Sequence, residues 1–504
     1  MTQKKTQQKT EKNRSHLRLI PQPLAVTPHG GDGFVLGSNT VIVDEGGPKI
    51  HPYCEVASSE LSAMIGSPIP VIDSLDDLGE HSPIRFIVSD HPSIPRGKEA
   101  YVLTVSAAEV LVLARKPRGI FRGLTTLLQL VQVSDDGTAH LDPVIVEDAP
   151  RYKWRGLSLD VARSFLPVAE VKQVIDLLAR YKMNVLHLHL SDDQGWRLEV
   201  PSRPSLTEAA GTTAVDGGRW GHYTVEDYAD LVQYAAARGI EIVPEFDTPG
   251  HVNAATHAYG ELNANGKPSP PFSGQKVGFS KLDPAVAETE PFLEDVFTDL
   301  AAITPGRYLH IGGDEALEMT PKEYETLVRS VVDKVRAQGK EAVAWQEAVE
   351  LDPPVDATIQ FWSPSNNRDA IARATNHGVR IIMSPADRVY LDMKYDSDTP
   401  LGLDWAGHTE LQDSYDWDPD QQIESMRPGS VTGVEAAVWT ETIHDLDALM
   451  YMLLPRLPAI AEVAWSPQGN RDFSDFSERI ADEPKWWGSR DWTWHRSPGV
   501  DWEE

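Results

Sequence analysis

From about residue 151 onward, short apolar runs alternate with amphipathic segments along most of the chain. Eight of these runs have the length and composition of buried strands, and they cover residues 156–160, 185–190, 240–245, 308–311, 342–345, 358–362, 379–383 and 433–439. Strands that alternate with helices form parallel βαβ units. Eight such units predict a (β/α)8 TIM barrel, with a doubly wound open sheet as the alternative.

The amphipathic segments between the runs predict the helices. The helix after Thr224 is the best defined, because Thr224 and Asp227 have the spacing of a capping box and Gly239 suits the C-terminal end. Further helices are expected at residues 168–182, 321–338, 368–376 and 445–455.

The chain before residue 150 follows another pattern. It predicts strands at residues 34–36, 40–43 and 85–88, a hairpin of 101–105 with 109–113, and a helix at 119–133. We therefore expect a small α+β domain over residues 19–150, a barrel domain over 151–485 and a C-terminal extension over 486–504. Residues 1–18, rich in Lys, Gln and Thr, read as a disordered basic tail. No catalytic cluster falls in the small domain, so a scaffolding role is expected for it.

The composition excludes several classes of partner and site. A formal charge of −30 disfavours nucleic acid and anionic membrane as partners, since both require basic surfaces. The single cysteine, Cys54, allows neither an internal disulfide nor a zinc–thiolate cluster. No apolar run is long enough for a membrane span and no secretory signal is visible. A cytoplasmic location is therefore expected, with export as the alternative if the true start differs.

In a (β/α)8 barrel, the active site lies at the C-terminal ends of the strands. The fourth run ends in Gly312, Gly313 and two adjacent acids, Asp314 and Glu315, and the glycines permit backbone angles that could turn both acids toward one site. The other runs also end in polar or aromatic residues, namely Asp160, Arg163, Asp192, His251, Trp345, Trp362, Tyr390, Asp392, Trp439 and Glu441.

These residue types match a pocket for a sugar. Tryptophan faces stack on the C–H faces of sugars, while carboxylates and Arg hydrogen-bond to hydroxyls, and a carboxylic acid can protonate a glycosidic oxygen. Each residue alone has a more common explanation. A lone Trp is more often core, a lone Arg is more often in a structural ion pair, and Asp192 could cap a helix. It is their shared position at strand ends that favours a glycosidase.

Several motifs resemble one known family. They are Asp-Val-Ala-Arg at 160–163, His-Leu-His-Leu-Ser-Asp-Asp-Gln-Gly-Trp-Arg at 187–197, Pro-Glu-Phe-Asp-Thr-Pro-Gly-His at 244–251, His-Ile-Gly-Gly-Asp-Glu at 310–315 and Tyr-Leu-Asp-Met at 390–393. In combination they resemble the family 20 glycoside hydrolases, the β-N-acetylhexosaminidases. The resemblance extends from about residue 100 to residue 465, and the N-terminal region is similar to the small domain that precedes the barrel in this family.

The resemblance implies an exo-acting, retaining, substrate-assisted mechanism, in which the 2-acetamido oxygen of the sugar attacks the anomeric carbon and forms an oxazolinium ion. Glu315 would be the general acid and then the base, Asp314 would orient the acetamido group, and Tyr390 would donate to its oxygen. The implied substrates are terminal β-linked GlcNAc or GalNAc, as in chitin fragments or other glycans. No cofactor and no metal are implied. The oligomeric state is left open.

The remaining site residues also take their roles from the resemblance. Arg163 and Glu441 would hold hydroxyls of the non-reducing sugar, Asp392 would support the acetamido site, and Asp192 and His251 would support the acid. Three tryptophans, Trp345, Trp362 and Trp439, would wall the pocket. The chain departs from many relatives at Ser164, where His is expected, and at Arg203, where Trp is common. We expect both differences to affect which leaving groups are preferred rather than the mechanism.

Two other functions compete with this reading. His187 and His189 mimic a His-x-His metal pair that Asp192, His251 and His310 could complete, as in a metal-dependent hydrolase. Such a pair belongs to the first strand of amidohydrolase-like barrels, however, and here it lies on the second. A non-catalytic carbohydrate-binding protein is the other alternative, although the intact acid pair disfavours it.

Overall fold

The computed structural model describes residues 17–134 and 136–503, so most of the expected basic tail lies outside the described residues. The chain divides into two compact units. One takes the chain up to Arg151 together with Trp465–Glu483 and Val500–Glu504, and the other comprises Tyr152–Ala464 and Pro484–Gly499. Across the described residues, no helix combines the length and apolar character that crossing a membrane requires.

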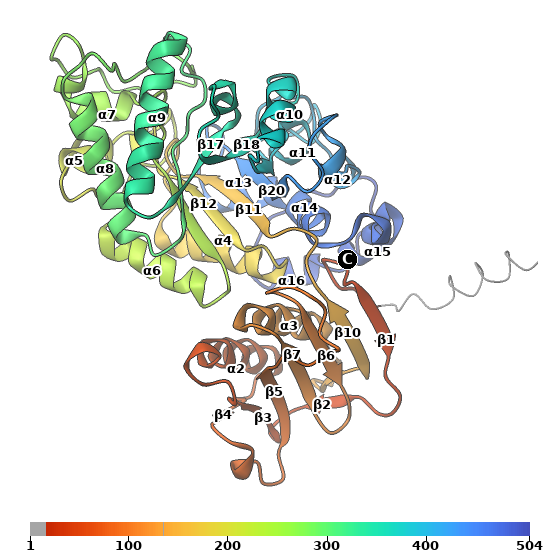
Figure 1. Ribbon diagram of the computed structural model, residues 1–504. Helices are drawn as coiled ribbons and strands as arrows, with labels where there is room; N and C mark the ends of the chain where they lie inside the picture. Colours follow the sequence, from red (N-terminus) through yellow and green to blue (C-terminus); the bar gives the residue numbers. More distant parts are fainter. Residues whose placement is uncertain (1–16, 135, 504) are drawn as a thin grey trace, which may run out of the picture. The chain divides into compact units, whose positions relative to one another are not determined.

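The N-terminal unit is a small α+β domain (Figure 1). Helix α3 (Pro117–Leu130) packs against the sheet, and α2 (His51–Ile65) packs against α3. The predicted hairpin is confirmed, whereas α2 was not predicted. The main sheet has the order β1-β10-β6-β7-β5-β3-β4, with bounds Ala25–Pro28, Val144–Asp148, Tyr101–Val105, Val110–Ala114, Ser82–Val88, Thr40–Val43 and Val71–Ile72. A smaller sheet has the order β2 (Phe34–Leu36), β9 (Ala139–Leu141) and β8 (Gln132–Val133).

The C-terminal part of the chain is divided differently from the expectation. The sequence placed residues 151–485 in the barrel domain and 486–504 in an extension. The structure instead groups Trp465–Glu483 with the N-terminal unit, where the guanidinium of Arg479 donates to the carbonyl of Leu19 at 2.7 Å. Such a bond joins residues far apart in the chain, so local sequence patterns carry no signal for it.

In the second unit, eight parallel strands close into a barrel (Figure 1). Strand β20 pairs with β11 and completes the ring. The predicted (β/α)8 barrel is confirmed, and the open-sheet alternative is wrong. The strands, in order, are β11 (Trp154–Asp160), β12 (Val185–His189), β15 (Glu241–Glu245), β16 (Tyr308–His310), β17 (Glu341–Trp345), β18 (Ala357–Phe361), β19 (Ile381–Met383) and β20 (Val431–Val438).

The expected helices are all present. In α6, Thr224 and Asp227 form the predicted capping box, each side chain accepting the other residue's backbone N–H at 3.0 Å. The five are α4 (Val168–Arg180), α6 (Val225–Ala236), α9 (Pro321–Ala337), α10 (Arg368–Asn376) and α13 (Leu446–Leu453). Elements that the sequence did not predict include β13 (Ser191–Asp192), β14 (Gly195–Trp196), α5 (Ser205–Ala210), α7 (Asn253–Ala258), α8 (Thr289–Ile303), α11 (Ala386–Val389), α12 (Leu411–Tyr415), α14 (Arg456–Trp465), α15 (Phe473–Ile480) and α16 (Pro484–Gly488).

Buried side chains of the barrel strands change from apolar to polar toward the C-terminal ends. An apolar cluster lies at the starts or middles of five strands and consists of Trp154, Val185, Val243, Val343 and Ile382. Side chains two residues apart on a strand share a face. The same faces of β12, β15 and β17 therefore continue with His187, Glu245 and Trp345, which are all buried. The apolar core thus leads into a polar layer at the end where a barrel's active site lies.

A glycine turn follows β16 and positions the two acids. Gly312 and Gly313 have φ of 72° and 105°, in the left-handed region that favours glycine. A Cβ on Gly312 would lie 1.7 Å from a carboxylate oxygen of Asp247, so no other residue fits there. Glu315 also has a positive φ, 43°, which is uncommon for a residue with a side chain.

We expect Gly312→Ala to lower the free energy of unfolding of the protein by about 1–3 kcal/mol, because the new methyl group forces Asp247 aside and strains the backbone. Gly488→Ala is the matched control in the same unit, since a Cβ there meets nothing within 4 Å. Thermal melting monitored by circular dichroism measures both variants. Equal melting temperatures would show that the turn tolerates a side chain.

Candidate active site

The structure brings the sequence-predicted residues together at the C-terminal ends of the barrel strands. Ring contacts join four of them: the ring centroids of Trp345 and Trp439 are 5.9 Å apart, those of Tyr390 and Trp439 are 6.1 Å apart, and Trp362 stacks on Tyr390 at 6.5 Å. The guanidinium of Arg163 lies 5.0 Å from the ring centroid of Trp439. Residues at the ends of β11, β17, β18 and β20, and in the segment after β19, therefore form one cluster of aromatic rings with an arginine against it.

The acid pair lies beside a single histidine. Nε2 of His251 is 3.4 Å from Oε2 of Glu315 and 3.9 Å from Oδ2 of Asp314. The Asp314 side chain is 14% exposed and that of Glu315 29%. Burial, with the nearby Glu315 and Glu245 carboxylates, raises the pKa of Asp314 to about 6, although His251 opposes the shift. Glu315 is thus the more exposed of the two acids, and Asp314 is the more buried.

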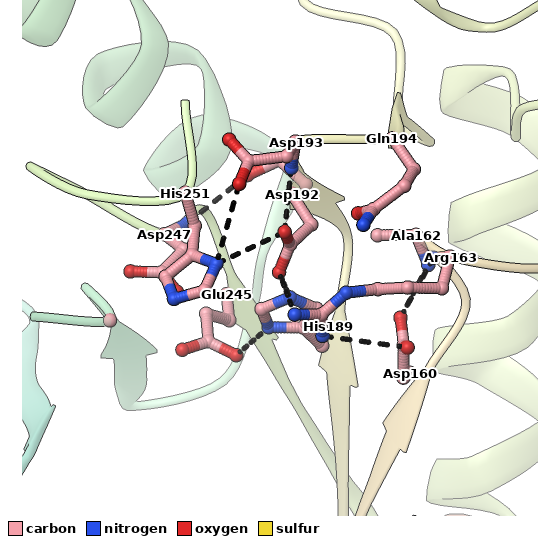
Figure 2. Close-up of polar contacts among 12 residues, drawn as sticks. Asp160, Ala162, Arg163, His189, Asp192, Asp193, Gln194, Glu245, Asp247 and His251 are labelled. Atoms are coloured by element: carbon pink, nitrogen blue, oxygen red, sulfur yellow. Dashed lines mark hydrogen bonds and ion pairs between the residues drawn. The ribbon is translucent and has the colours of Figure 1, made fainter. Parts of the chain in front are cut away.

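Asp192 is the polar centre of the site (Figure 2). Its Oδ1 accepts the backbone N–H of Asp193 at 2.6 Å and Nδ1–H of His251 at 3.1 Å. Its Oδ2 contacts Nε2 of His189 at 2.7 Å and Nη2 of Arg163 at 2.9 Å. Burial alone would raise the pKa of Asp192, but Arg163 and His251 hold it well below its usual range. Asp192 is therefore an anion, and it fixes an arginine and a histidine at once.

His251 carries a positive charge in this arrangement. Burial alone would lower its pKa, but Asp192 and Asp314 hold the pKa of His251 well above its usual range. Its backbone has a positive φ of 54°, which is uncommon outside glycine. The residue is thus held in a costly conformation that brings its ring between Asp192 and the acid pair.

Several buried polar atoms at this end of the barrel have no hydrogen-bond partner in the described residues. They include Nε and Nη1 of Arg163, Oδ1 of Asp314 and Oε2 of Glu441. A buried polar atom without a partner is costly. Donors and acceptors left free in one pocket suit a ligand with many hydroxyl groups, which can satisfy both kinds.

The sequence reasoning missed two residues of the pocket. Trp405 is 54% exposed, and its ring centroid lies 5.8 Å from that of Tyr390 and 6.0 Å from that of Trp362. Glu347 accepts a hydrogen bond from Nε1 of Trp362 at 3.2 Å, and burial together with Asp314 raises the pKa of Glu347 to about 8. Trp405 lies far beyond a strand end, where the strand-end rule gives no signal, whereas Glu347 lies two residues after β17 and was within reach of that rule.

The two departures from the family pattern have different surroundings. Ser164 directly follows Arg163, and its hydroxyl accepts the backbone N–H of Arg219 at 3.1 Å. Arg203 forms ion pairs with Glu288 at 2.7 Å and Asp295 at 2.8 Å. Arg203 therefore packs against α8 and the residue before it. An effect of either residue on leaving-group preference stays a prediction.

The His-x-His pair is held by carboxylates. His187 contacts Glu245 at 3.0 Å and Glu435 at 2.9 Å through its two ring nitrogens. His189 contacts Glu245 and Asp192 in the same way. Burial opposes the charge, but these carboxylates raise the pKa of His187 to about 9 and that of His189 to about 10. Each ring nitrogen of the two histidines thus faces a carboxylate, which is the geometry of a buried ion-pair network.

Comparison with known proteins gives the family. Residues 152–468 match the model of the glycosyl hydrolase family 20 catalytic domain, and residues 16–149 match that of glycosyl hydrolase family 20, domain 2. A β-N-acetylhexosaminidase of Cellulomonas fimi is 47% identical over 96% of this chain and 97% of its own length.

Solved structures agree with the family match. A mutant Streptomyces plicatus β-hexosaminidase in complex with the product GlcNAc is 41% identical, with a TM-score of 0.91 over 97% of this chain and 98% of that one. An exo β-N-acetylglucosaminidase from Vibrio harveyi in complex with N-acetylglucosamine is 27% identical, with a TM-score of 0.83 over 95% of this chain and 78% of that one.

A parallel barrel whose strand ends carry acids, an arginine and clustered aromatic rings has the architecture of a glycoside hydrolase. The chain belongs to glycosyl hydrolase family 20, as a β-N-acetylhexosaminidase of that family.

The raised pKa of Asp314 predicts a pH-dependent gain in stability when its charge is removed. The folded-state pKa of about 6 exceeds the ordinary value of 3.8, so the ionised carboxylate destabilises the fold above pH 6, and this cost disappears below pH 3.8. Asp314→Asn should therefore raise the free energy of unfolding by roughly 2–3 kcal/mol at pH 8, and the gain should fade as the pH falls.

Melting temperatures of the wild type and Asp314→Asn between pH 4 and pH 8 measure this effect. Glu208→Gln, a substitution at an exposed residue, is the control for removing one surface charge. A gain of the same size at every pH would contradict the assignment of the effect to the buried charge.

Proposed function

We propose that the enzyme releases terminal, non-reducing, β-linked GlcNAc or GalNAc by a substrate-assisted, retaining mechanism. The observation that carries the proposal is that Asp314 and Glu315 leave the same strand end and contact the same nitrogen of His251. In most retaining glycosidases, one carboxyl group of the enzyme acts as acid and a second acts as nucleophile, and the two lie on opposite sides of the glycosidic bond. Two acids on one side of the sugar leave the role of nucleophile to the substrate's acetamido oxygen.

In the first step, Glu315 donates its proton to the glycosidic oxygen as the bond to the anomeric carbon breaks. Its greater exposure suits contact with the leaving group at the mouth of the pocket. The acetamido oxygen forms a bond to the anomeric carbon, which gives an oxazolinium ion. The Asp314 carboxylate accepts the acetamido N–H and stabilises the positive charge that develops there.

In the second step, the Glu315 carboxylate accepts a proton from water. The water oxygen forms a bond to the anomeric carbon from the side that the leaving group vacated. The bond to the acetamido oxygen breaks, so the sugar leaves with its configuration retained. Glu315 is then protonated for the next cycle, and Asp314 has remained ionised throughout.

Tyr390 completes the acetamido site in this proposal. Burial and the nearby Asp392 hold the pKa of Tyr390 well above its usual range, so the phenol keeps the proton that it donates to the acetamido oxygen. The flat faces of Trp362 and Trp439 beside it are suited to enclose the acetamido methyl group and the sugar ring. Asp392 is buried behind Tyr390 and supports this end of the pocket.

The buried polar atoms at this end of the barrel support exo action in this proposal. Two donor atoms of Arg163 and one oxygen of Glu441 are buried without a hydrogen-bond partner among the described residues, and they suit the hydroxyl groups of a terminal sugar. A chain that continued from those hydroxyls would have to displace these side chains. The exo activity named for the similar Vibrio harveyi protein supports the same reading.

A panel of 4-nitrophenyl β-glycosides tests the proposal. The N-acetylglucosaminide should react at least about 10³-fold faster than the glucoside, because the glucoside lacks the intramolecular nucleophile. Replacing the acetyl group by fluoroacetyl groups should slow the reaction with each added fluorine, since fluorine weakens the attacking oxygen. Equal rates with and without the acetamido group would contradict substrate assistance, and sugar binding without release of 4-nitrophenol would favour the carbohydrate-binding alternative.

Glu315→Gln should slow the cleavage of substrates with poor leaving groups by roughly 10²–10⁴-fold, because the proton donor is lost. Substrates with good leaving groups, such as the 2,4-dinitrophenyl glycoside, should lose much less in the first step. Steady-state kinetics across a series of phenols measures the difference. A loss of the same size for all leaving groups would count against the acid role.

A further inference from the structure

His189 lies between two carboxylates below the active site (Figure 2). Its Nε2 contacts Oδ2 of Asp192 at 2.7 Å, and its Nδ1 contacts Oε2 of Glu245 at 2.5 Å. The side chain is 1% exposed. Because an acceptor faces each ring nitrogen, both nitrogens donate, and the ring cannot rotate without losing two charge-assisted hydrogen bonds.

The lower carboxylate, Glu245, is itself firmly held. Its Oε1 accepts Nε1–H of Trp345 at 2.9 Å and lies 2.8 Å from Nδ1 of His310. Its Oε2 lies 3.0 Å from Nε2 of His187. These partners come from β12, β16 and β17, so Glu245 is fixed to three strands of the barrel besides its own. His189 is thus anchored to the most rigid part of the unit.

The upper carboxylate, Asp192, holds two residues of the proposed active site, Arg163 and His251. The oxygen that His189 contacts is the one that also contacts Arg163, and the other oxygen orients His251 beside Glu315. If Asp192 rotated about its side-chain bonds, it would disturb the sugar-binding arginine and the histidine of the acid together. His189 is the contact that opposes this rotation from the core side.

We propose that His189 is a positioning residue, which holds Asp192 in the single orientation that serves Arg163 and His251 at once. This inference rests on the proposed function, in which Glu315 is the acid. Burial alone would favour a neutral ring, but Glu245 and Asp192 raise the pKa of His189 to about 10. The ring, held by a hydrogen bond at each nitrogen, is therefore charged at neutral pH.

His187 provides a matched control. It is as buried as His189, lies two residues away on the same face of β12, and also bridges two carboxylates, Glu245 and Glu435. It does not contact Asp192 in any hydrogen bond or ion pair among the described residues. A purely structural role for such a histidine would give the same result at both positions.

The experiment compares His189→Gln with His187→Gln by melting temperature and by kinetics on aryl N-acetylglucosaminides with a range of leaving groups. We expect His189→Gln to reduce kcat/KM for substrates with poor leaving groups by about 10–100-fold, because a misplaced acid loses part of its contribution to the rate. The dependence of kcat/KM on the leaving group should become steeper. His187→Gln should lower the melting temperature without changing that dependence. The same leaving-group dependence in both variants would overturn the proposal.

A double-mutant cycle with Glu315→Gln provides a second test. Without the acid, the part of the His189→Gln loss that acts through His251 and Glu315 should disappear, so the double variant should lose less activity on poor leaving groups than the two single losses predict together. A fully additive loss would overturn the proposal. If the proposed function itself is wrong, the wild type will cleave the 4-nitrophenyl N-acetylglucosaminide and the glucoside at equal rates. That result is distinct from either outcome of the cycle.

If His189→Gln does not fold, nuclear magnetic resonance of the wild type labelled with ¹⁵N-histidine keeps the proposal testable. Two strongly shifted ring N–H signals that persist in His187→Gln and do not titrate up to about pH 9 are expected for His189. A His189 ring that loses a proton within the active pH range would overturn the proposal.

Discussion

Charge compensation inside the barrel governs the architecture of the catalytic end. Glu245 is fully buried and faces three histidines and an indole N–H. An isolated buried carboxylate would cost several kcal/mol, and removing one partner of such a group leaves the others uncompensated. The polar layer is therefore a single network. At Asp192 this network leaves the core and reaches Arg163 and His251.

The acids and the aromatic wall could be predicted from the sequence because two simple rules apply to them. Parallel strands bring their C-terminal ends to one edge, so Asp314, Trp345 and Trp439 had to lie near one another. The glycines at 312 and 313 showed where the chain must turn. The structure adds the reason for the first glycine, which is the carboxylate of Asp247 packed where a Cβ would stand.

Other features could not be predicted because they depend on contacts between distant parts of the chain. Trp405 reaches the pocket from a loop well past β19, and Glu347 acquires its raised pKa only through burial beside Asp314. The His-x-His motif alone also gives no sign of the buried carboxylates Glu245, Glu435 and Asp192, which reach it from other strands and loops. The grouping of residues 465–483 with the N-terminal unit is likewise a long-range effect.

The shared carboxylate of Asp192 has a consequence for how such an enzyme can diversify. Arg163 and His251 depend on opposite oxygens of one side chain. A substitution that moves Asp192 therefore perturbs Arg163 and His251 together, so selection cannot adjust the surroundings of these two residues independently. Changes in substrate range are expected to accumulate instead at exposed positions such as Trp405, which lies on a loop and does not contact Asp192, Arg163 or His251 in any ring contact or hydrogen bond among the described residues.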